Sequence, residues 1–340
     1  MSTRSLPALS FSLLLACVSG CGQKAAEPTA AAPQADQAPP ATPAAKEETV
    51  VRLGYQKIGS PFLLKDRATD LKAALTKHNA RAEWVEFQAG PPLLEAMRAG
   101  AVDIGYVGET PPVFAQAGGV PFVYIAVDAP APAAEAIVVP KNSKVQSVAE
   151  LEGKKIAVNR GSNVHYLLVK ALESAKLAIT DVQVSYLAPP DARAAFDTGQ
   201  VDAWVIWDPF YAAAEVAGAR TLVDGKGLVD NQLFYVARRE YAEKNPTLVN
   251  VVLDEYERIS AWAKTNPEEV AKILAASSGI AYEALLLAEK RHAYDVRPIE
   301  PETLAQQQTI ADTFFELQLI PQSIKTADAF LSTTRFGNGS

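Results

Sequence analysis

Hydrophobic and polar residues alternate along most of the chain in the pattern of successive strands and helices. A short β-rich run at residues 50–55 is followed by a helical pattern over 65–78 and by a second β-rich run at 82–87. Two further helix starts come at proline-containing turns, 89–92 and 109–112, where proline loses no amide partner. Strands that alternate with helices in this way predict an α/β fold built on doubly wound, mostly parallel sheets.

The pattern also repeats within the chain. Four residues recur at a constant offset, since Pro91, Gly100, Val102 and Asp103 return as Pro190, Gly199, Val201 and Asp202. Each set reads proline, helix, glycine, and then Val-Asp entering a strand. The repeat favours two lobes of similar build, each a mostly parallel sheet flanked by helices. A single domain that reuses a common α/β turn is the alternative.

Two β-rich stretches bounded by loop residues, 135–140 and 233–237, have the character of crossings between lobes. If they run side by side, they form two hinge strands. The predicted first lobe is then 49–137 plus 237–340, and the second lobe is 138–236. A chain that crosses twice forms a hinge, and a hinge allows a cleft to close.

The first fifty residues have a different character. Arg4 precedes an apolar stretch that is too short for a permanent transmembrane helix, so residues 1–20 are predicted to be a signal peptide. The run Val18-Ser19-Gly20-Cys21 resembles a bacterial lipobox, which predicts a lipid on Cys21. An ordinary secretory signal with a stray cysteine is the alternative. Residues 21–48, rich in alanine and proline, are predicted to be a disordered tether.

Composition narrows the chemistry of the remaining chain. Removing Arg4 with the leader leaves 31 basic residues against 39 acidic ones, a formal charge of −8, which argues against a nucleic-acid partner. No cysteine follows Cys21, so a disulfide and a cysteine-based zinc site are excluded beyond that residue. The sequence shows no His/Glu spacing typical of a metal site, and no cofactor is expected.

Three loops follow predicted strands and precede predicted helices, at 88–91, 106–110 and 160–165. Ligands of open parallel sheets bind at such places, because the helices present free amides and the positive ends of their dipoles. The third loop suits an anion best. Gly161 lets the backbone approach closely, and its neighbours offer donors, namely Ser162, Asn163 and His165.

Each of these donors also has an ordinary structural interpretation. Ser162 and Asn163 can be simple helix caps, and His165 can be a structural histidine tied to the backbone. The place of His165 in the first turn after the glycine loop favours a role in the cleft. His78 and His292 lie amid charged helical surface and suggest no role.

The segment 202–209 places Trp204 and Trp207 three residues apart, with Asp208 next to a proline. Either tryptophan could form an apolar wall for an alkyl chain, and core packing is expected for one of them. Asp208 could form a hydrogen bond across the cleft. Tyr55 and Gln56, just past the first strand, hold the matching position in the first lobe.

At these residues the chain resembles the aliphatic sulfonate-binding proteins of ABC transporters. The matching segments are 53–57, 84–87, 89–91, 111–117, Gly161-Ser162 with His165, 191–196, 201–204 and 206–209. The resemblance covers nearly the whole chain after the tether. It implies a type II periplasmic-binding fold that captures alkanesulfonates and delivers them to an ABC permease in the inner membrane for sulfur supply.

The resemblance also implies ligand contacts, to which the loop argument adds Asn163. The expected set is Gln56, Gly90, Gly108, Glu109, Thr110, Gly161, Ser162, Asn163, His165, Trp204 and Asp208. The family often has aspartate in place of Glu109 and a serine-rich stretch in place of Asn163-Val164, so the preferred sulfonate stays open. The sulfonate is expected near Gly161-Ser162, with its tail toward Trp204 and Tyr55.

Other functions on the same fold are the alternatives. Taurine carries an ammonium group that Glu109 or Asp208 could pair with, whereas nitrate has no tail for a tryptophan-lined pocket. An enzyme of the pyrimidine-precursor type would need a nucleophile, an acid–base pair or a lysine in the cleft. The three loops offer none of these, so a binding protein without catalytic activity is expected. It is predicted to be a monomer in the periplasm, anchored to a membrane of undetermined identity through Cys21.

Overall fold

The computed structural model describes residues 47–67 and 69–330 of the chain. The contacts between residues divide the chain into two units, residues 1–45 and residues 46–340. The helices and strands described below lie in the second unit. The predicted signal peptide, the lipidation site Cys21 and nearly all of the predicted tether lie outside the described residues. Within the described ranges, no helix is both long and apolar enough to cross a membrane.

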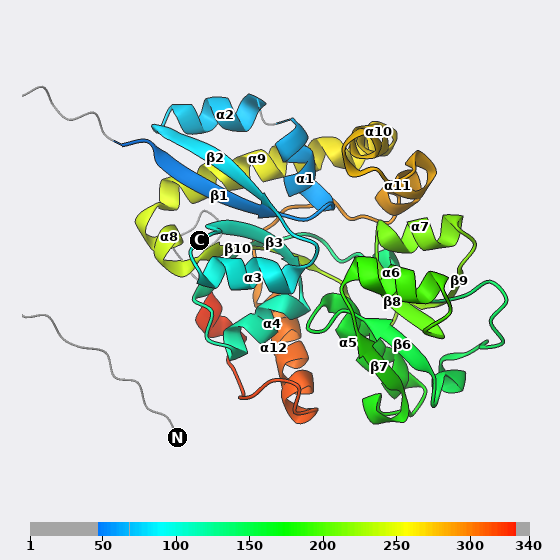
Figure 1. Ribbon diagram of the computed structural model, residues 1–340. Helices are drawn as coiled ribbons and strands as arrows, with labels where there is room; N and C mark the ends of the chain where they lie inside the picture. Colours follow the sequence, from blue (N-terminus) through cyan, green and yellow to red (C-terminus); the bar gives the residue numbers. More distant parts are fainter. Residues whose placement is uncertain (1–46, 68, 331–340) are drawn as a thin grey trace, which may run out of the picture. The chain divides into compact units, whose positions relative to one another are not determined.

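The strands of the described chain form two sheets of five (Figure 1). The first sheet has the order β2-β1-β3-β10-β4 and contains β1 (Thr49–Tyr55), β2 (Ala80–Glu86), β3 (Ile104–Gly108), β4 (Phe122–Val127) and β10 (Leu233–Arg238). The second sheet has the order β7-β6-β8-β5-β9 and contains β5 (Glu135–Val139), β6 (Lys155–Val158), β7 (Gln183–Tyr186), β8 (Ala203–Trp207) and β9 (Arg220–Asp224).

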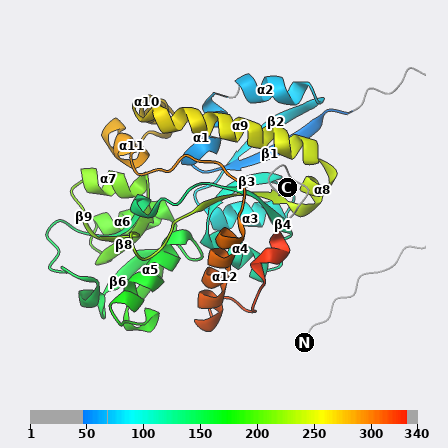
Figure 2. The ribbon, with the colours of Figure 1, turned by 180° about the vertical axis from the view of Figure 1, so that it is seen from behind.

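Helices flank both sheets, as Figure 1 and the reverse view in Figure 2 show. The second sheet carries α5 (Asn163–Ser174), α6 (Pro189–Asp197) and α7 (Phe210–Val216). The other helices are α1 (Gly59–Asp66), α2 (Thr69–Thr76), α3 (Gly90–Arg98), α4 (Thr110–Ala117), α8 (Arg239–Lys244), α9 (Pro246–Thr265), α10 (Pro267–Ser278), α11 (Tyr282–Glu289) and α12 (Pro301–Glu316). Short 3₁₀ turns occur at Pro132–Ala134, Val148–Leu151, Ile179–Asp181 and Thr326–Ala329.

The two sheets share one topology. In the first, β1 pairs in parallel with β2 and β3, and β10 runs antiparallel between β3 and β4. In the second, β6 pairs in parallel with β7 and β8, and β5 runs antiparallel between β8 and β9. The predicted α/β fold with two sheets flanked by helices is therefore confirmed. We call the first sheet with the helices outside the α5–α7 group the first lobe, and the second sheet with α5–α7 the second lobe.

The crossings between the lobes differ from the expected hinge strands. The stretches 135–140 and 233–237 do not pair with each other, because β5 pairs within the second sheet and β10 within the first. The chain instead crosses in the segments just before them, 128–134 and 225–232. These two segments lie side by side, since Ala131 N donates to Asp230 O at 3.0 Å and Gly225 N donates to Pro132 O at 3.0 Å. The expected lobe boundaries at 137/138 and 236/237 fall inside β5 and β10, a few residues further along the chain.

The sequence repeat corresponds to a repeated tie between neighbouring strands. In the first lobe Asp103 accepts a hydrogen bond from Arg52 N at 3.0 Å, and its own N–H donates to Arg52 O at 2.8 Å. In the second lobe Asp202 accepts from Lys155 N at 2.8 Å and donates to Lys155 O at 2.7 Å. Each aspartate thus aligns the strand that follows it with the first parallel strand of its sheet.

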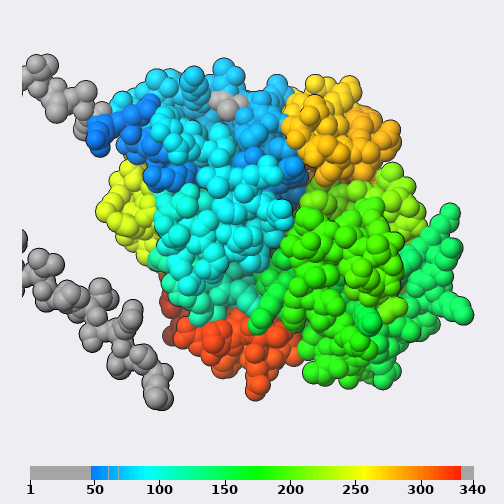
Figure 3. All heavy atoms as spheres, in the orientation of Figure 1, coloured from blue at the N-terminus to red at the C-terminus, as the bar shows by residue number. Residues whose placement is uncertain are grey.

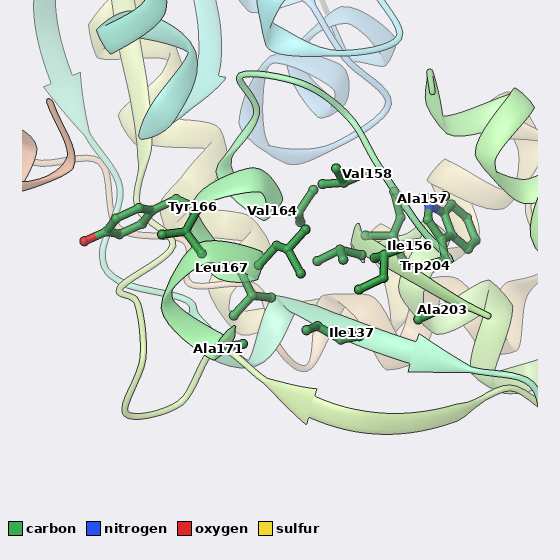
Figure 4. Packing of buried hydrophobic residues seen from close by; sticks show 14 of the residues in the cluster. Ile137, Ile156, Ala157, Val158, Val164, Tyr166, Leu167, Ala171, Ala203 and Trp204 are labelled. Atoms are coloured by element: carbon green, nitrogen blue, oxygen red, sulfur yellow. The ribbon is translucent and has the colours of Figure 1, made fainter. Parts of the chain in front are cut away.

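Each lobe has its own apolar core. In the second lobe, Ile137, Ile156, Val164 and Leu167 pack between the sheet and α5, as Figure 4 shows. Trp204 packs on the other face of the sheet, against Phe196 of α6. This core extends into the first lobe, because Phe314 on α12 packs against the His165 ring of α5 at a centroid distance of 5.2 Å. The helix α12 therefore connects the two lobes on one side of the cleft.

Candidate ligand-binding site

A narrow pocket of about 30 Å³ lies where the two lobes meet, and it has room for only two or three water-sized groups. Figure 3 shows the cyan first-lobe segment directly against the green second-lobe segment along one face of the described chain. The lining residues come from both lobes and from both crossing segments. They are Gln56, Ile58, Gly90, Gly108, Pro111, Ala131, Ala134, Ser162, Asn163, Trp207, Asp208, Asn231, Leu233 and His292.

Three helices begin at this pocket. The helix α3 begins at Gly90, α4 at Thr110 and α5 at Asn163, and residues at or just before each start line the pocket. A helix N-terminus carries unpaired N–H groups and a partial positive charge. Because the lining contains no lysine or arginine, these helix starts are its main source of positive potential. The pocket is therefore suited to a small anion.

Two glycines allow the elements around the pocket to approach closely. A Cβ atom on Gly90 would lie 2.7 Å from Pro111 Cγ, and one on Gly108 would lie 2.8 Å from Asn163 Oδ1. Gly108 belongs to the first lobe and Asn163 to the second. A side chain at Gly108 would thus hold the lobes apart at the pocket.

Hydrogen bonds fix the polar side chains of the lining. Gln56 Nε2 donates to Tyr106 O at 3.0 Å. Asn163 Nδ2 donates to the carboxyl of Glu135 and to Asn231 Oδ1, the latter at 3.0 Å. Asn231 Nδ2 in turn donates to Ala131 O at 2.9 Å, which joins α5 to both crossing segments. Such fixed dipoles favour binding, because they need little reorganisation when a ligand arrives.

Asp208 is the one carboxyl group among the lining residues. Its Oδ1 accepts a hydrogen bond from Ala212 N at 2.9 Å, and its Oδ2 lies 3.5 Å from Arg291 Nη1. Burial raises the pKa of Asp208 to about 7, although the nearby Arg291 charge acts in the opposite direction. The first-lobe cation Arg291 thus limits the negative charge that the pocket presents to an anion.

His292 also lines the pocket, although the sequence pattern had placed it on charged helical surface. Its side chain is half-buried, and Nε2 is enclosed without a hydrogen-bond partner among the described residues. Burial lowers the pKa of His292 to about 4. The ring is therefore neutral at pH 7 and can offer a single N–H.

An apolar chamber of about 190 Å³ adjoins the pocket. The two share Gln56, Ile58 and Trp207 as lining residues. The Trp207 and Phe210 rings form one wall, edge to face at a centroid distance of 6.3 Å. The remaining lining residues are Lys57, Glu86, Phe87, Gln88, Pro190, Ser278 and Ile280.

Of the residues expected to contact ligand, six line the pocket, namely Gln56, Gly90, Gly108, Ser162, Asn163 and Asp208. The other five are not among its lining residues. Thr110 is fully buried at the start of α4. Glu109 lines a separate cavity beside Asp230, and its Oε2 accepts a hydrogen bond from Gln232 N at 2.9 Å. Burial raises the pKa of Glu109 to about 8.

Gly161 and His165 do not line the pocket, and their contacts lie within the second lobe and against Phe114. Gly161 has a φ of +70° and faces Phe114 in a separate groove. Its N–H donates to His165 Nδ1 at 3.3 Å, and the other ring nitrogen lies 3.4 Å from the Tyr186 hydroxyl. His165 therefore stabilises the loop that positions Ser162 and Asn163, because both of its nitrogens are occupied within the lobe.

The two tryptophans have different roles. Trp207, and not the expected Trp204, lines the pocket and the chamber. Trp204 is 1% exposed and packs against Phe196 in the second-lobe core at a centroid distance of 5.9 Å. Tyr55, the other expected tail contact, stacks on Phe62 and donates its hydroxyl hydrogen to Glu86 at 3.0 Å.

Comparison with known proteins places the chain in a family. Residues 51–285 match the family described as the substrate binding domain of an ABC-type glycine betaine transport system. An aliphatic sulfonates-binding protein of Escherichia coli (strain K12) is 41% identical over 278 residues, which cover 81% of this chain and 86% of that protein. The chain belongs to the substrate-binding proteins of ABC transporters.

Two further members of this family of substrate-binding proteins extend the comparison. An aliphatic sulfonates-binding protein of Bacillus subtilis (strain 168) is 31% identical over 290 residues, 85% of this chain and 87% of that protein. The solved alkanesulfonate-binding protein SsuA of Xanthomonas axonopodis pv. citri, bound to MOPS, is 36% identical with a TM-score of 0.80. The match covers 84% of this chain and 99% of the SsuA chain.

The described residues show no metal centre to set beside this pocket. No group of three or more histidine, cysteine, aspartate or glutamate side chains in the described ranges is arranged to hold a metal ion. The chemistry of the pocket is therefore that of helix starts, fixed dipoles and an adjoining apolar wall.

Proposed function

We propose that this protein captures aliphatic sulfonates and delivers them to an ABC permease as a source of sulfur. The observation that carries the proposal is the junction of two unlike spaces. A narrow pocket at three helix starts adjoins an apolar chamber and shares three lining residues with it. An alkanesulfonate has the same division into a compact anionic head and an apolar tail.

The sulfonate oxygens would lie at the helix starts, where they accept hydrogen bonds from backbone N–H groups. Three oxygens on one sulfur can reach donors from α3, α4 and α5 at the same time. The tail would lie against Trp207 and Phe210. Burial of apolar surface contributes about 25 cal/mol per Å², so affinity should increase with tail length.

The same geometry argues against taurine and nitrate as preferred ligands. Taurine would bring an ammonium group, which needs a free carboxylate in the pocket. Glu109 does not line the pocket, and Asp208 already faces Arg291 at 3.5 Å. Nitrate would leave the apolar chamber empty. Small alkanesulfonates and ring-bearing sulfonates use both spaces.

The proposal includes the setting of the protein. We propose that residues 1–20 are a signal peptide, that Cys21 carries a lipid, and that the protein works as an anchored periplasmic monomer. The tether up to residue 48 would let the lobes reach a permease in the inner membrane. The two lobes would close about the crossing segments, with 49–137 plus 237–340 and 138–236 as their approximate extents.

The proposal assigns binding and no catalysis. The lining of the pocket contains no lysine, no cysteine and no tyrosine, and its histidine is neutral at pH 7. His292 and Asp208 do not form a hydrogen bond with each other, so the lining offers no activated nucleophile. No cofactor is proposed.

Titration calorimetry tests the function directly. Residues 46–340, the unit that contains the described contacts, are titrated with methane-, butane- and octanesulfonate, and with MOPS, taurine, nitrate and sulfate. We expect the alkanesulfonates to bind, with affinity rising from methane- to butanesulfonate, and taurine and nitrate to bind at least tenfold more weakly, about 1.4 kcal/mol. If taurine or nitrate binds more tightly than the alkanesulfonates, that anion becomes the proposed substrate. If no compound in the panel binds, the proposal is overturned.

A further inference from the structure

A cation of the first lobe contacts the second lobe at one edge of the cleft. Arg291 follows α11, and Leu285 of this helix packs in the first-lobe core with Leu274 of α10. The partners of Arg291 are on the second lobe, where Asp208 follows β8 and Glu215 lies on α7. Figures 1 and 2 both show α11 beside α7.

Side chains of the second lobe hold this cation through a charge pair and a ring contact. Arg291 Nη2 lies 2.5 Å from Glu215 Oε2, and the guanidinium lies over the Tyr211 ring at 4.2 Å. Thr221 Oγ1 donates to Glu215 Oε1 at 2.9 Å and lies 2.8 Å from the Tyr211 hydroxyl. An arginine that enters this site therefore meets a carboxylate and a ring already fixed by Thr221.

Small side chains let the two helices approach at the same place. Ala212 on α7 packs against Ala284 and Ala288 on α11, and all three are almost fully buried. Because a methyl group occupies little space, the backbones come close enough for Arg291 to reach across. The contact is thus part apolar surface and part ion pair, and it exists only while the lobes are together.

The ion pair bears on the ligand through Asp208. This carboxyl lines the pocket, and its Oδ2 has no hydrogen-bond partner among the described residues and lies 3.5 Å from Arg291 Nη1. A sulfonate in the pocket would lie beside this carboxyl, and two negative charges at that separation repel each other. A positive charge behind Asp208 offsets the repulsion.

We propose that Arg291 is a positioning residue for ligand capture, which latches α11 to α7 across the cleft and neutralises Asp208 beside the bound anion. The latch rests on the proposed binding of an anion in this pocket. It adds to that function an account of how the closed form is held and why an acid is tolerated there.

The test combines Arg291→Met with Asp208→Asn, singly and together. Methionine keeps much of the length of the side chain and removes its charge. For butanesulfonate we expect Arg291→Met to raise Kd at least tenfold, mainly through faster dissociation, as for other buried charge pairs. Asp208→Asn in the same chain should restore at least threefold of that loss, because it removes the uncompensated carboxylate.

A matched control separates this role from general support of the fold. Arg258 on α9 pairs with Glu255 and Asp70 at 2.8 Å each, away from the pocket lining. Arg258→Met should leave Kd and the dissociation rate unchanged. If Arg291→Met also leaves both unchanged, or if Asp208→Asn rescues none of the loss, the proposal is overturned.

Two additional measurements keep the test decisive. If Arg291→Met does not fold, Glu215→Gln replaces it, with an expected dissociation rate three- to tenfold faster, and an unchanged rate would refute the latch. The second measurement uses no ligand. The distance between spin labels on the two lobes should lengthen in Arg291→Met alone, even if none of the sulfonates binds the wild type. The latch and the sulfonate function can therefore fail separately.

Discussion

The two lobes share a strand order and a sequence repeat, yet they fill equivalent positions with different side chains. The offset between Asp103 and Asp202 makes β3 of the first sheet equivalent to β8 of the second. The strand pairing agrees, because Gly54 of β1 pairs with Gly105, and Ala157 of β6 pairs with Trp204. At the equivalent core position the first lobe thus has Gly105 and the second has Trp204. The backbone plan is common, and the difference lies in which partner fills the space.

In the first lobe that space belongs to a leucine. A Cβ atom on Gly105 would lie 2.4 Å from Leu93 Cδ2, so Leu93 on α3 occupies the volume. In the second lobe the residue at the position of Leu93 is Ala192 on α6, and the Trp204 ring fills the volume from the strand instead. Large and small side chains have exchanged places between helix and strand, which keeps both cores packed.

The same offset aligns the residues at the pocket. Gly108 corresponds to Trp207, and Glu109 corresponds to Asp208. The first lobe thus offers a bare backbone against which Asn163 closes, whereas the second offers an aromatic wall. The comparison teaches that one backbone plan presents two different walls at the pocket, a bare backbone in the first lobe and an aromatic side chain in the second.

The largest expected effect is loss of the Trp204 ring from the second-lobe core. Trp204→Ala should lower the free energy of unfolding by about 4 kcal/mol, because it removes a fully buried ring and leaves a cavity. Trp207→Ala should cost less stability and should weaken octanesulfonate binding about tenfold. Urea denaturation and calorimetry on both variants check the division. A Trp204→Ala variant that keeps wild-type stability but binds sulfonates weakly would reverse the two roles.

The two aspartate ties provide the next comparison. Asp103 is fully buried and also binds Arg238 at 2.7 Å, whereas Asp202 is exposed and forms no ion pair with another described residue. Asp103→Ala should therefore destabilise the protein by about 3 kcal/mol, since it strands a partly buried arginine. Asp202→Ala should cost about 1 kcal/mol, the value of one hydrogen bond. Urea denaturation measures both, and equal losses would show that the ion pair contributes nothing.

The shared plan was accessible from sequence because its signals are local. Alternation, proline at helix starts and the Gly-Val-Asp repeat each depend on neighbouring residues, and they predicted the two sheets and the helix starts at 89–92 and 109–112. The hinge strands were different. Residues 135–140 and 233–237 were correctly predicted as strands, but the partner of a strand is set by distant segments, so their pairing with each other was wrong.

The residues of the site were likewise predictable only as far as neighbouring residues determine them. Trp204 and Trp207 are three apart in a strand and so point to opposite faces, but only the packed sheet determines which face is the core. His292 and Asn231 reach the pocket from segments that come together only in the folded chain. His165 was expected in the cleft because loop position alone does not reveal that Gly161 N and Tyr186 occupy both ring nitrogens.

Gly108→Ala tests whether the first lobe needs a bare backbone at the position equivalent to Trp207. Gly108→Ala would bring Cβ to 2.8 Å from Asn163 Oδ1, across the interface between the lobes. We expect butanesulfonate affinity to fall about tenfold, or 1.4 kcal/mol, because the lobes cannot fully close. Thermal unfolding without ligand should change little. If Asn163→Ala, which frees that space, does not recover part of the loss in the double variant, steric contact between the lobes is not the cause.

The smallest expected effect distinguishes the equivalent acids Glu109 and Asp208 by pH. Burial raises the pKa of Glu109 to about 8 and that of Asp208 to about 7, where Arg291 opposes it. In the unfolded chain both ionise near pH 4, so between pH 6.5 and 8 only the folded protein holds these protons, and its stability falls as pH rises. The histidines do not interfere, because the pKa of His165 and of His292 is lowered to about 4, and stability linked to them is lost only as pH falls below 6.5.

The measurement is the free energy of unfolding at pH 6.5, 7 and 8 in three proteins. The wild type should lose on the order of 1 kcal/mol for each raised carboxyl that titrates in this window. Glu109→Gln should flatten the curve over the whole window, because the folded pKa of Glu109 is about 8, whereas Asp208→Asn should flatten it mainly below pH 7. Identical curves for the two variants would mean that Arg291 does not separate the two acids. The difference between the lobes at this position would then lie in shape alone.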